Sequence, residues 1–254
     1  MKKVTIFTMI LFFGVVSIGF PCELIVRVPM GNTYLPFFEQ DQNGKWSGLA
    51  IEIAEALLEE SGCKPVYKSL PFPRALEDLK KGKIHLMLNL TATDERGKFT
   101  NFIGPQLNET VVLVIRKVSP PNIASLDDFK KLPKSIGVER GKVYGKAFEE
   151  KRSKDAEFRK KLEEVTEVNL LELMLEKGRI SGFLGYGYNV FYRLKTDPSY
   201  INFSVHPHPI NQDWVYFGFS RQSVPDDMLK RLQEAYDRLH AKGTFEEIKQ
   251  RYRF

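Results

Sequence analysis

The sequence has few of the residues on which metal sites and nucleophilic active sites depend. Its 254 residues include two cysteines and four histidines. The histidines lack both the i, i+4 helical spacing and the neighbouring paired carboxylates typical of zinc sites; they are His85, His206, His208 and His240. No G-x-S-x-G turn and no G-x-x-x-x-G-K-[ST] phosphate loop occurs. We therefore expect no metal ion, no cofactor and no covalent catalysis.

Long hydrophobic runs are also scarce, apart from one at the amino terminus. Residues 4–18 carry no charge, follow the basic start Met1-Lys-Lys, and lead to a small-x-small sequence at residues 17–19. Such a run is short for a membrane span and is typical of a secretory signal. The sequence therefore predicts a signal peptide at residues 1–19 and a mature protein in the periplasm.

Neither sign of charge dominates the chain. It has 38 Lys and Arg against 32 Asp and Glu, and the formal net charge of +6 falls to +4 without Lys2 and Lys3. Because the two signs are interspersed, the sequence lacks the basic patch that indicates nucleic-acid binding. It also lacks repeats and flexible linkers, and its length suits one large domain or two smaller lobes.

The two cysteines, Cys22 and Cys63, belong to a chain bound for an oxidising compartment, where a disulfide is the expected state. Each precedes a predicted strand, and neighbouring strands of one sheet would bring them together. The alternative makes Cys22 the lipidated first residue of a lipoprotein. Because Phe20 and Pro21 suit a lipidation signal poorly, we predict a Cys22–Cys63 disulfide.

Hydrophobic patterns predict alternating strands and helices, as in an α/β protein. Strands are expected at residues 24–28, 66–70, 84–88, 110–115, 135–138 and 180–184. The charge-rich residues 146–164 are interpreted as a solvated helical stretch, and residues 185–189 as a loop. Asn169 is interpreted as the cap of the helix between them.

The carboxyl-terminal part of the chain is predicted to be helical. Pro225 begins a long amphipathic helix that Gly243 ends. Thr244 and Glu247 have the spacing of a capping box for a last helix.

A candidate binding loop lies between Pro71 and Pro105, where a buried strand leads into Thr91-Ala-Thr-Asp-Glu-Arg96. Loops past the carboxyl ends of strands bind ligands in open α/β sheets, because free backbone N–H groups point into the crevice there. Thr91 and Thr93 add hydroxyls, and Arg96 has the planar fork that binds a carboxylate. The alternative is an ordinary connection with Thr93 as N-cap and Arg96 on a solvated face.

Four segments, in the same order, give the chain a resemblance to a known family. They are residues 26–49, the segment 71–105, residues 125–141 with Ser-Leu-Asp-Asp and Ile-Gly-Val-Glu-Arg-Gly, and residues 239–248. Together they resemble the periplasmic solute-binding proteins of the polar amino acid type, family 3 of the bacterial extracellular binding proteins. The resemblance covers nearly the whole mature chain.

The resemblance implies a type II periplasmic binding protein fold, an α/β protein of two lobes. Each lobe is expected to have a central sheet flanked by helices, and two crossing strands join the lobes. Lobe I is expected to comprise residues 20–111 and 216–254, and lobe II residues 112–215.

The resemblance also implies a ligand crevice of aromatic and cationic side chains between the lobes. The expected ligand-binding residues are Tyr34, Phe72, Arg74, Thr91, Thr93 and Arg96 from lobe I, with Glu139, Arg140, Lys142, Tyr144 and Tyr186 from lobe II. In relatives that bind α-amino acids, an arginine matching Arg96 holds the carboxylate and two acids often hold the amine. Here those acid positions fall on Gly31 and Tyr186, which weakens the expectation of an ordinary α-amino acid ligand.

The function implied is capture of a small carboxylate-bearing or zwitterionic solute and its delivery to a membrane ABC permease by a monomeric protein. One alternative is an enzyme similar to the cyclohexadienyl dehydratases of this fold, with Glu139 as acid and Arg74 and Arg96 as carboxylate-binding cations. Another is a sensory binding module that docks to a membrane receptor. No nucleic-acid partner is expected.

Overall fold

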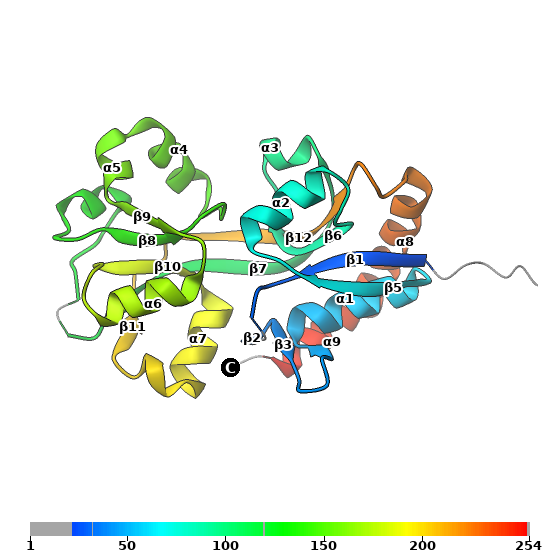
Figure 1. The fold of residues 1–254 in the computed structure, drawn as a ribbon, viewed down its shortest axis with the longest axis horizontal. Coiled ribbons are helices and arrows are strands. Elements are labelled where there is room, and N and C mark those ends of the chain that lie inside the picture. The colour runs from blue at the N-terminus through cyan, green and yellow to red at the C-terminus, as the bar shows by residue number, and fades with distance from the viewer. Residues whose placement is uncertain (1–21, 32, 119, 253–254) are drawn as a thin grey trace, which may run out of the picture.

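The computed structural model describes residues 22–31, 33–118 and 120–252, so the signal peptide predicted at residues 1–19 lies outside the described residues. Within this part of the chain, strands and helices form two lobes side by side, joined by long strands that run through both (Figure 1). The two-lobe α/β architecture predicted from the sequence is therefore confirmed.

Lobe I begins with the predicted βαβ unit. Its main strands, β1 (Cys22–Val28), β5 (Cys63–Ser69) and β6 (Leu86–Thr91), are parallel, and β1 lies between the other two. A small separate sheet contains β2 (Thr33–Tyr34), β3 (Phe38–Gln40) and β4 (Trp46–Ser47). The helices are α1 (Leu49–Glu60), α2 (Phe72–Lys80), α3 (Asp94–Gly97), α8 (Asp226–Lys242) and α9 (Thr244–Arg251).

Lobe II contains the second set of strands, of which β8 and β10 are parallel neighbours and β9 lies at the edge. The strands are β8 (Ile136–Glu139), β9 (Leu162–Val165), β10 (Gly182–Tyr186) and β11 (Phe203–Val205). The helices are α4 (Lys146–Lys154), α5 (Ala156–Lys160), α6 (Val168–Glu176) and α7 (Gly187–Thr196), with short 3₁₀ helices at Leu126–Lys131 and Pro198–Tyr200.

Two antiparallel strands, β7 (Thr100–Arg116) and β12 (Asn211–Ser220), pass between the lobes. In lobe I, β12 pairs with β6; in lobe II, β7 pairs with β10 and β11. The two lobes therefore share one continuous sheet, and β7 extends well beyond the predicted strand at residues 110–115. The carboxyl ends of β1 and β6 matter for the site, because ligands bind past the carboxyl ends of strands in open α/β sheets.

Helices α8 and α9 pack on lobe I, far along the chain from its other elements (Figure 1). Leu232, Tyr236 and Phe245 join Leu57 of α1 and Phe217 of β12 in one hydrophobic core. Burial of these apolar faces is the main favourable term that attaches the carboxyl-terminal helices. The core supports the discontinuous lobe I inferred from the sequence, and the boundaries at residues 111 and 216 stay a prediction.

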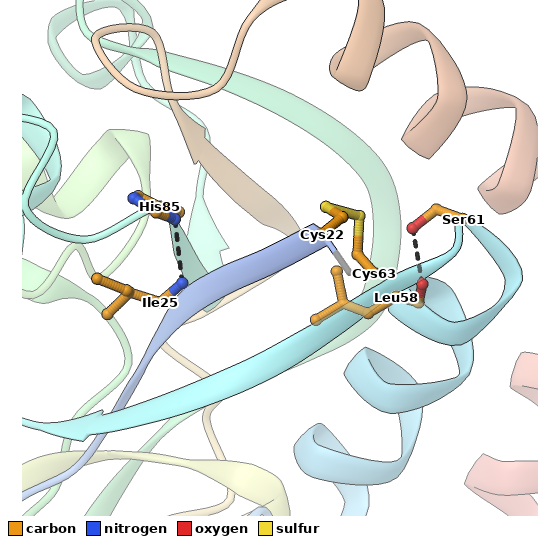
Figure 2. Close-up of a disulfide and its surroundings, with 6 residues drawn as sticks. All are labelled: Cys22, Ile25, Leu58, Ser61, Cys63 and His85. Carbon is orange, nitrogen blue, oxygen red and sulfur yellow. Dashed lines mark hydrogen bonds between the residues drawn. A yellow bond between two sulfur atoms is a disulfide. The ribbon is translucent and has the colours of Figure 1, made fainter. Parts of the chain in front are cut away.

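The predicted disulfide between Cys22 and Cys63 is present (Figure 2). The two residues pair across the amino ends of β1 and β5, with their Cα atoms 4.4 Å apart. Beside them His85 Nδ1 accepts a hydrogen bond from the Ile25 N–H, 3.1 Å away (Figure 2). The disulfide therefore lies at the end of β1 opposite the cleft.

Four local predictions were wrong. The stretch 146–164 is not all helical, because it ends in the edge strand β9, whose exposed Glu163 and Glu164 hide the strand signal. Residues 185–189 are not a loop: α7 begins at Gly187. Helix α6 begins at Val168, before Asn169, and Gly243 rather than a capping box precedes α9.

Among the described residues, no helix is long and apolar enough to cross a membrane.

Candidate ligand-binding site

A cavity of about 310 Å³ lies between the two lobes, at the carboxyl ends of β1 and β6. Lobe I contributes Arg27, Tyr34 and Phe72, and lobe II contributes Lys142 and Tyr186. Its size is that of a small-molecule site, with aromatic walls and a few polar groups. We therefore take this cavity as the candidate site and refer to it as the cleft.

Three cations converge on the ring of Phe72, the first residue of α2. The guanidinium carbons of Arg27 and Arg96 lie 5.6 and 5.7 Å from the ring centroid, and Lys142 Nζ lies 4.1 Å from it. A cation over an aromatic face is attracted by the ring quadrupole, but three cations around one ring also repel one another. Negative charge nearby would reduce the repulsion within the cluster of Arg27, Arg96 and Lys142.

None of these three cations has a carboxylate oxygen of the described residues within 4.0 Å. Arg27 donates through Nε to the Leu70 carbonyl, 3.0 Å away, and burial lowers its pKa to about 10, partly offset by Glu139. Burial also lowers the pKa of Lys142. The cluster therefore contains one buried cation, Arg96, and two half-buried ones, Arg27 and Lys142, and no described residue forms an ion pair with them within 4.0 Å.

Arg96 is held by backbone carbonyls from both lobes. Its side chain is 6% exposed; Nη1 donates to Thr91 O at 2.8 Å, and Nη2 donates to Gly141 O at 2.9 Å. Gly141 has a φ of +80°, in the left-handed region, and a Cβ at this position would lie 3.6 Å from Phe72 Cδ1. Arg96 thus lies on no solvated face, and it connects lobe I to lobe II at the margin of the cleft.

Three acidic residues line the cleft: Glu109 on β7, Glu139 at the end of β8, and Glu167 before α6. Glu109 is 6% exposed, and burial raises its pKa to about 8, against an opposing effect of Lys142. Glu109 is therefore largely protonated at neutral pH.

The raised pKa of Glu109 predicts a stability that falls as the pH rises. Between its ordinary pKa of 4.5 and about 8 the folded protein holds a proton that the unfolded chain releases. In this window the free energy of unfolding is expected to fall by on the order of 1 kcal/mol per pH unit. The Glu109→Gln variant is expected not to show this fall. Urea unfolding at pH 5, 6.5 and 8 measures it. The exposed Glu59→Gln variant is the control, and parallel curves for Glu109→Gln and the wild type would contradict the assignment.

Asn89 adds a polar group to the cleft from an unusual backbone position. It has a positive φ of 51° within β6, where the pairing with β12 shifts register. Asparagine tolerates this conformation better than most residues. Its N–H donates to Gln106 Oε1 at 2.9 Å, whereas its buried Oδ1 has no hydrogen-bond partner among the described residues. A ligand N–H or O–H is the partner that this oxygen lacks.

The aromatic wall of lobe II is supported from behind. Tyr186 stacks on Tyr144 with ring centroids 6.1 Å apart, and the Tyr144 hydroxyl accepts a hydrogen bond from the Glu139 N–H at 2.7 Å. Tyr144 is 1% exposed and lines no part of the cleft. It therefore fixes the positions of Tyr186 and Glu139 without facing the cavity.

The structure brings five of the predicted site residues together on the cleft wall: Tyr34, Phe72, Glu139, Lys142 and Tyr186. The other six lie outside the lining, and their positions differ. Thr91 and Arg96 are buried at the margin, and Thr93 is the N-cap of α3, accepting from the Arg96 N–H. Arg74 and Arg140 are exposed and form ion pairs with Asp78 and Glu164.

The residues of the cleft that were not predicted from the sequence include four polar or charged ones: Arg27, Asn89, Glu109 and Glu167. Arg27 and Glu109 have a local signal, because each is a lone charge in or beside an apolar strand run, near the end where strands meet the cleft. Such a charge is costly in a core and therefore indicates a site. Asn89 has no comparable signal, since its role depends on the bulge.

A second, more open cavity of about 680 Å³ lies between β2 and the helices α6 and α7, and Tyr34 borders both cavities. Its charged groups already pair with one another: Arg193 forms ion pairs with Glu172 and Asp197, and Glu172 also accepts from the Tyr200 hydroxyl. Glu176, an exposed carboxylate, also lines this cavity, so its described residues offer an anionic ligand no unpaired cation, and the cleft is the stronger candidate.

Two relatives are similar to the chain over most of its length. The probable amino-acid-binding protein YxeM of Bacillus subtilis (strain 168) is 26% identical over 216 residues, covering 85% of this chain and 79% of the relative. The putative ABC transporter arginine-binding protein 2 of Escherichia coli (strain K12) is 24% identical over 256 residues, covering 98% of this chain and 97% of the relative.

Solved structures share the fold. An ancestral arginine-binding protein bound to glutamine superposes with a TM-score of 0.76 at 21% identity, covering 92% of this chain and 99% of that one. The ancestral amino acid-binding protein AncCDT-1, a precursor of cyclohexadienyl dehydratase, superposes with a TM-score of 0.71 at 20% identity. This match covers 91% of this chain and 94% of that one. The family described as bacterial extracellular solute-binding proteins, family 3, matches residues 26–254. The chain belongs to that family, which includes the amino-acid-binding proteins of ABC transporters.

Proposed function

We propose that the protein is an extracytoplasmic solute-binding protein that captures a small carboxylate-bearing or zwitterionic, amino acid-like solute in the cleft and delivers it to an ABC permease. The observation that carries the proposal is the cluster of Arg27, Arg96 and Lys142 around Phe72, without close carboxylate partners among the described residues. An anionic ligand group supplies the missing negative charge.

The cleft fits a mechanism in which the ligand favours lobe closure. Its walls come from both lobes, so a ligand makes all its contacts only when the lobes meet. Arg96 donates to Gly141 across the gap, and Asn189 of α7 donates to Leu35 O in lobe I. Closure of this kind gives a permease one ligand-dependent surface to bind.

A thermal-shift screen of the mature protein against amino acids, dicarboxylates and amines tests the proposal. A ligand at 100 times its Kd adds about 2.7 kcal/mol to the free energy of unfolding. Carboxylates are expected to stabilise the protein, and amines without a carboxylate are not. Stabilisation by amines alone would contradict the proposal, and loss of solute uptake in cells lacking the protein separates transport from a sensory role.

A second candidate function is a dehydratase of the cyclohexadienyl type, and Glu109 is the observation that favours it. Its pKa of about 8 keeps a buried carboxylic acid protonated in a cleft that also holds Arg27 and Lys142. Elimination from prephenate needs a proton donor for the departing hydroxyl and cations for the carboxylates. For a protein that only binds, incubation with prephenate yields no phenylpyruvate; phenylpyruvate that disappears in Glu109→Gln would establish the enzyme.

A further inference from the structure

Lys142 places an ammonium of the protein inside the aromatic part of the cleft. Its Nζ lies 4.1 Å from the ring centroid of Phe72 in lobe I and 5.1 Å from that of Tyr186 in lobe II. Facing aromatic rings are a common binding environment for ammonium groups, including those of ligands. In this protein a lysine side chain already occupies that environment.

Two of the three acids of the cleft act on the same ammonium. Burial lowers the pKa of Lys142; Glu139, and Glu109 when ionised, oppose that shift, whereas Arg27 and Arg96 add to it. Glu139 is three residues from Lys142 on the same turn, where the Lys142 N–H donates to the Glu139 carbonyl at 3.2 Å. Glu109 reaches the cleft from β7, in the strand pair that joins the lobes. The groups suited to a ligand ammonium thus already surround Lys142.

A ligand with its own ammonium would therefore add a fourth positive charge to Arg27, Arg96 and Lys142. In a cleft closed off from water, like charges repel more strongly than in solution. Gly31, which also lines the cleft, offers no side chain to offset the charge. A carboxylate without an α-amino group meets the three cations and avoids this repulsion.

We propose that Lys142 is a specificity-determining residue that takes the place of a ligand ammonium, so that the cleft selects carboxylates lacking an α-amino group over the corresponding α-amino acids. The inference rests on the proposed binding function and narrows its ligand class. It sets this chain apart from the relatives named as amino-acid-binding proteins.

Calorimetric titration with matched pairs tests the assignment. The pairs are L-aspartate with succinate, L-glutamate with glutarate, L-phenylalanine with 3-phenylpropanoate, and L-arginine with 5-guanidinopentanoate. For the pair that binds most tightly, we expect the wild type to bind the des-amino member at least tenfold more tightly. Lys142→Met keeps an unbranched side chain of nearly the same length and removes its charge, so this ratio is expected to fall at least tenfold. Lys142→Arg is expected to preserve the preference.

Lys146→Met, on the exposed start of α4, is the matched control and is expected to leave the ratio unchanged. Lys142→Gln provides a second neutral variant if the methionine variant fails to fold. The role of Lys142 is overturned if the wild type prefers the amino acid, or if Lys142→Met and Lys142→Gln leave the ratio unchanged. The proposed binding function would still stand in either case. Absence of binding to every member of every pair overturns the proposed carboxylate-binding function together with this inference.

Discussion

Replacing Arg96 by Ala is expected to weaken binding of the carboxylate ligand at least about thirtyfold. The guanidinium is buried, has no close carboxylate partner among the described residues, and donates to Gly141 O across the lobes. The variant therefore loses both a positive charge at the margin of the cleft and a contact between the lobes. Removing one partner of a buried charge-assisted contact costs of the order of 2–5 kcal/mol, which is the source of the thirtyfold figure.

Titration calorimetry on folded variants measures this loss. Arg96→Lys is not expected to restore full affinity, because one ammonium cannot reach the Thr91 and Gly141 carbonyls with the geometry of a planar fork. The exposed Arg231→Ala variant on α8 is the control, and Arg74→Ala is expected to change the affinity less than threefold because its guanidinium is exposed. A folded Arg96→Ala variant that binds within threefold of the wild type would refute the role of Arg96.

The regular elements of lobe I were readable from the sequence because each buries one face in a simple period. In α1 the buried Leu49, Ile53 and Leu57 recur at helical spacing, and in β1 alternate residues are buried. Elements with weaker local patterns were missed. The edge strand β9 exposes two glutamates, and α7 opens with glycine and tyrosine, a composition typical of loops.

The composition of the cleft was only partly readable, because it depends on how distant segments meet. Phe72, Lys142 and Tyr186 belong to segments far apart in the chain, and the order of segments shared with the family brought them together in the prediction. The hydrogen bond from Arg96 to the Gly141 carbonyl could not be predicted, because it depends on the relative position of the lobes, which no local pattern encodes. Glu109 was missed because it lies one residue before the crossing strand predicted at residues 110–115, whereas β7 begins at Thr100.

Removal of the Cys22–Cys63 disulfide is expected to lower the free energy of unfolding by about 4 kcal/mol. The bond closes a loop with a sequence separation of 41 residues, and loop-closure entropy for that length gives the figure. Denaturant unfolding of a Cys22→Ser, Cys63→Ser double variant against the oxidised wild type measures the loss. A reductant should destabilise the wild type by a similar amount and leave the double variant unchanged.

The same removal is expected to spare the ligand affinity of the folded protein, because the disulfide and the cleft lie at opposite ends of β1. Arg27 lies five positions after Cys22 in β1, which is a distance of about 17 Å at the rise of a β-strand. The parallel pairing of β1 with β5 continues from Cys22 to Val28, so the backbone that positions Arg27 has other support. Calorimetry at a temperature where both proteins are folded should give affinities within threefold. A larger loss would mean that the disulfide also fixes the position of Arg27 in the cleft.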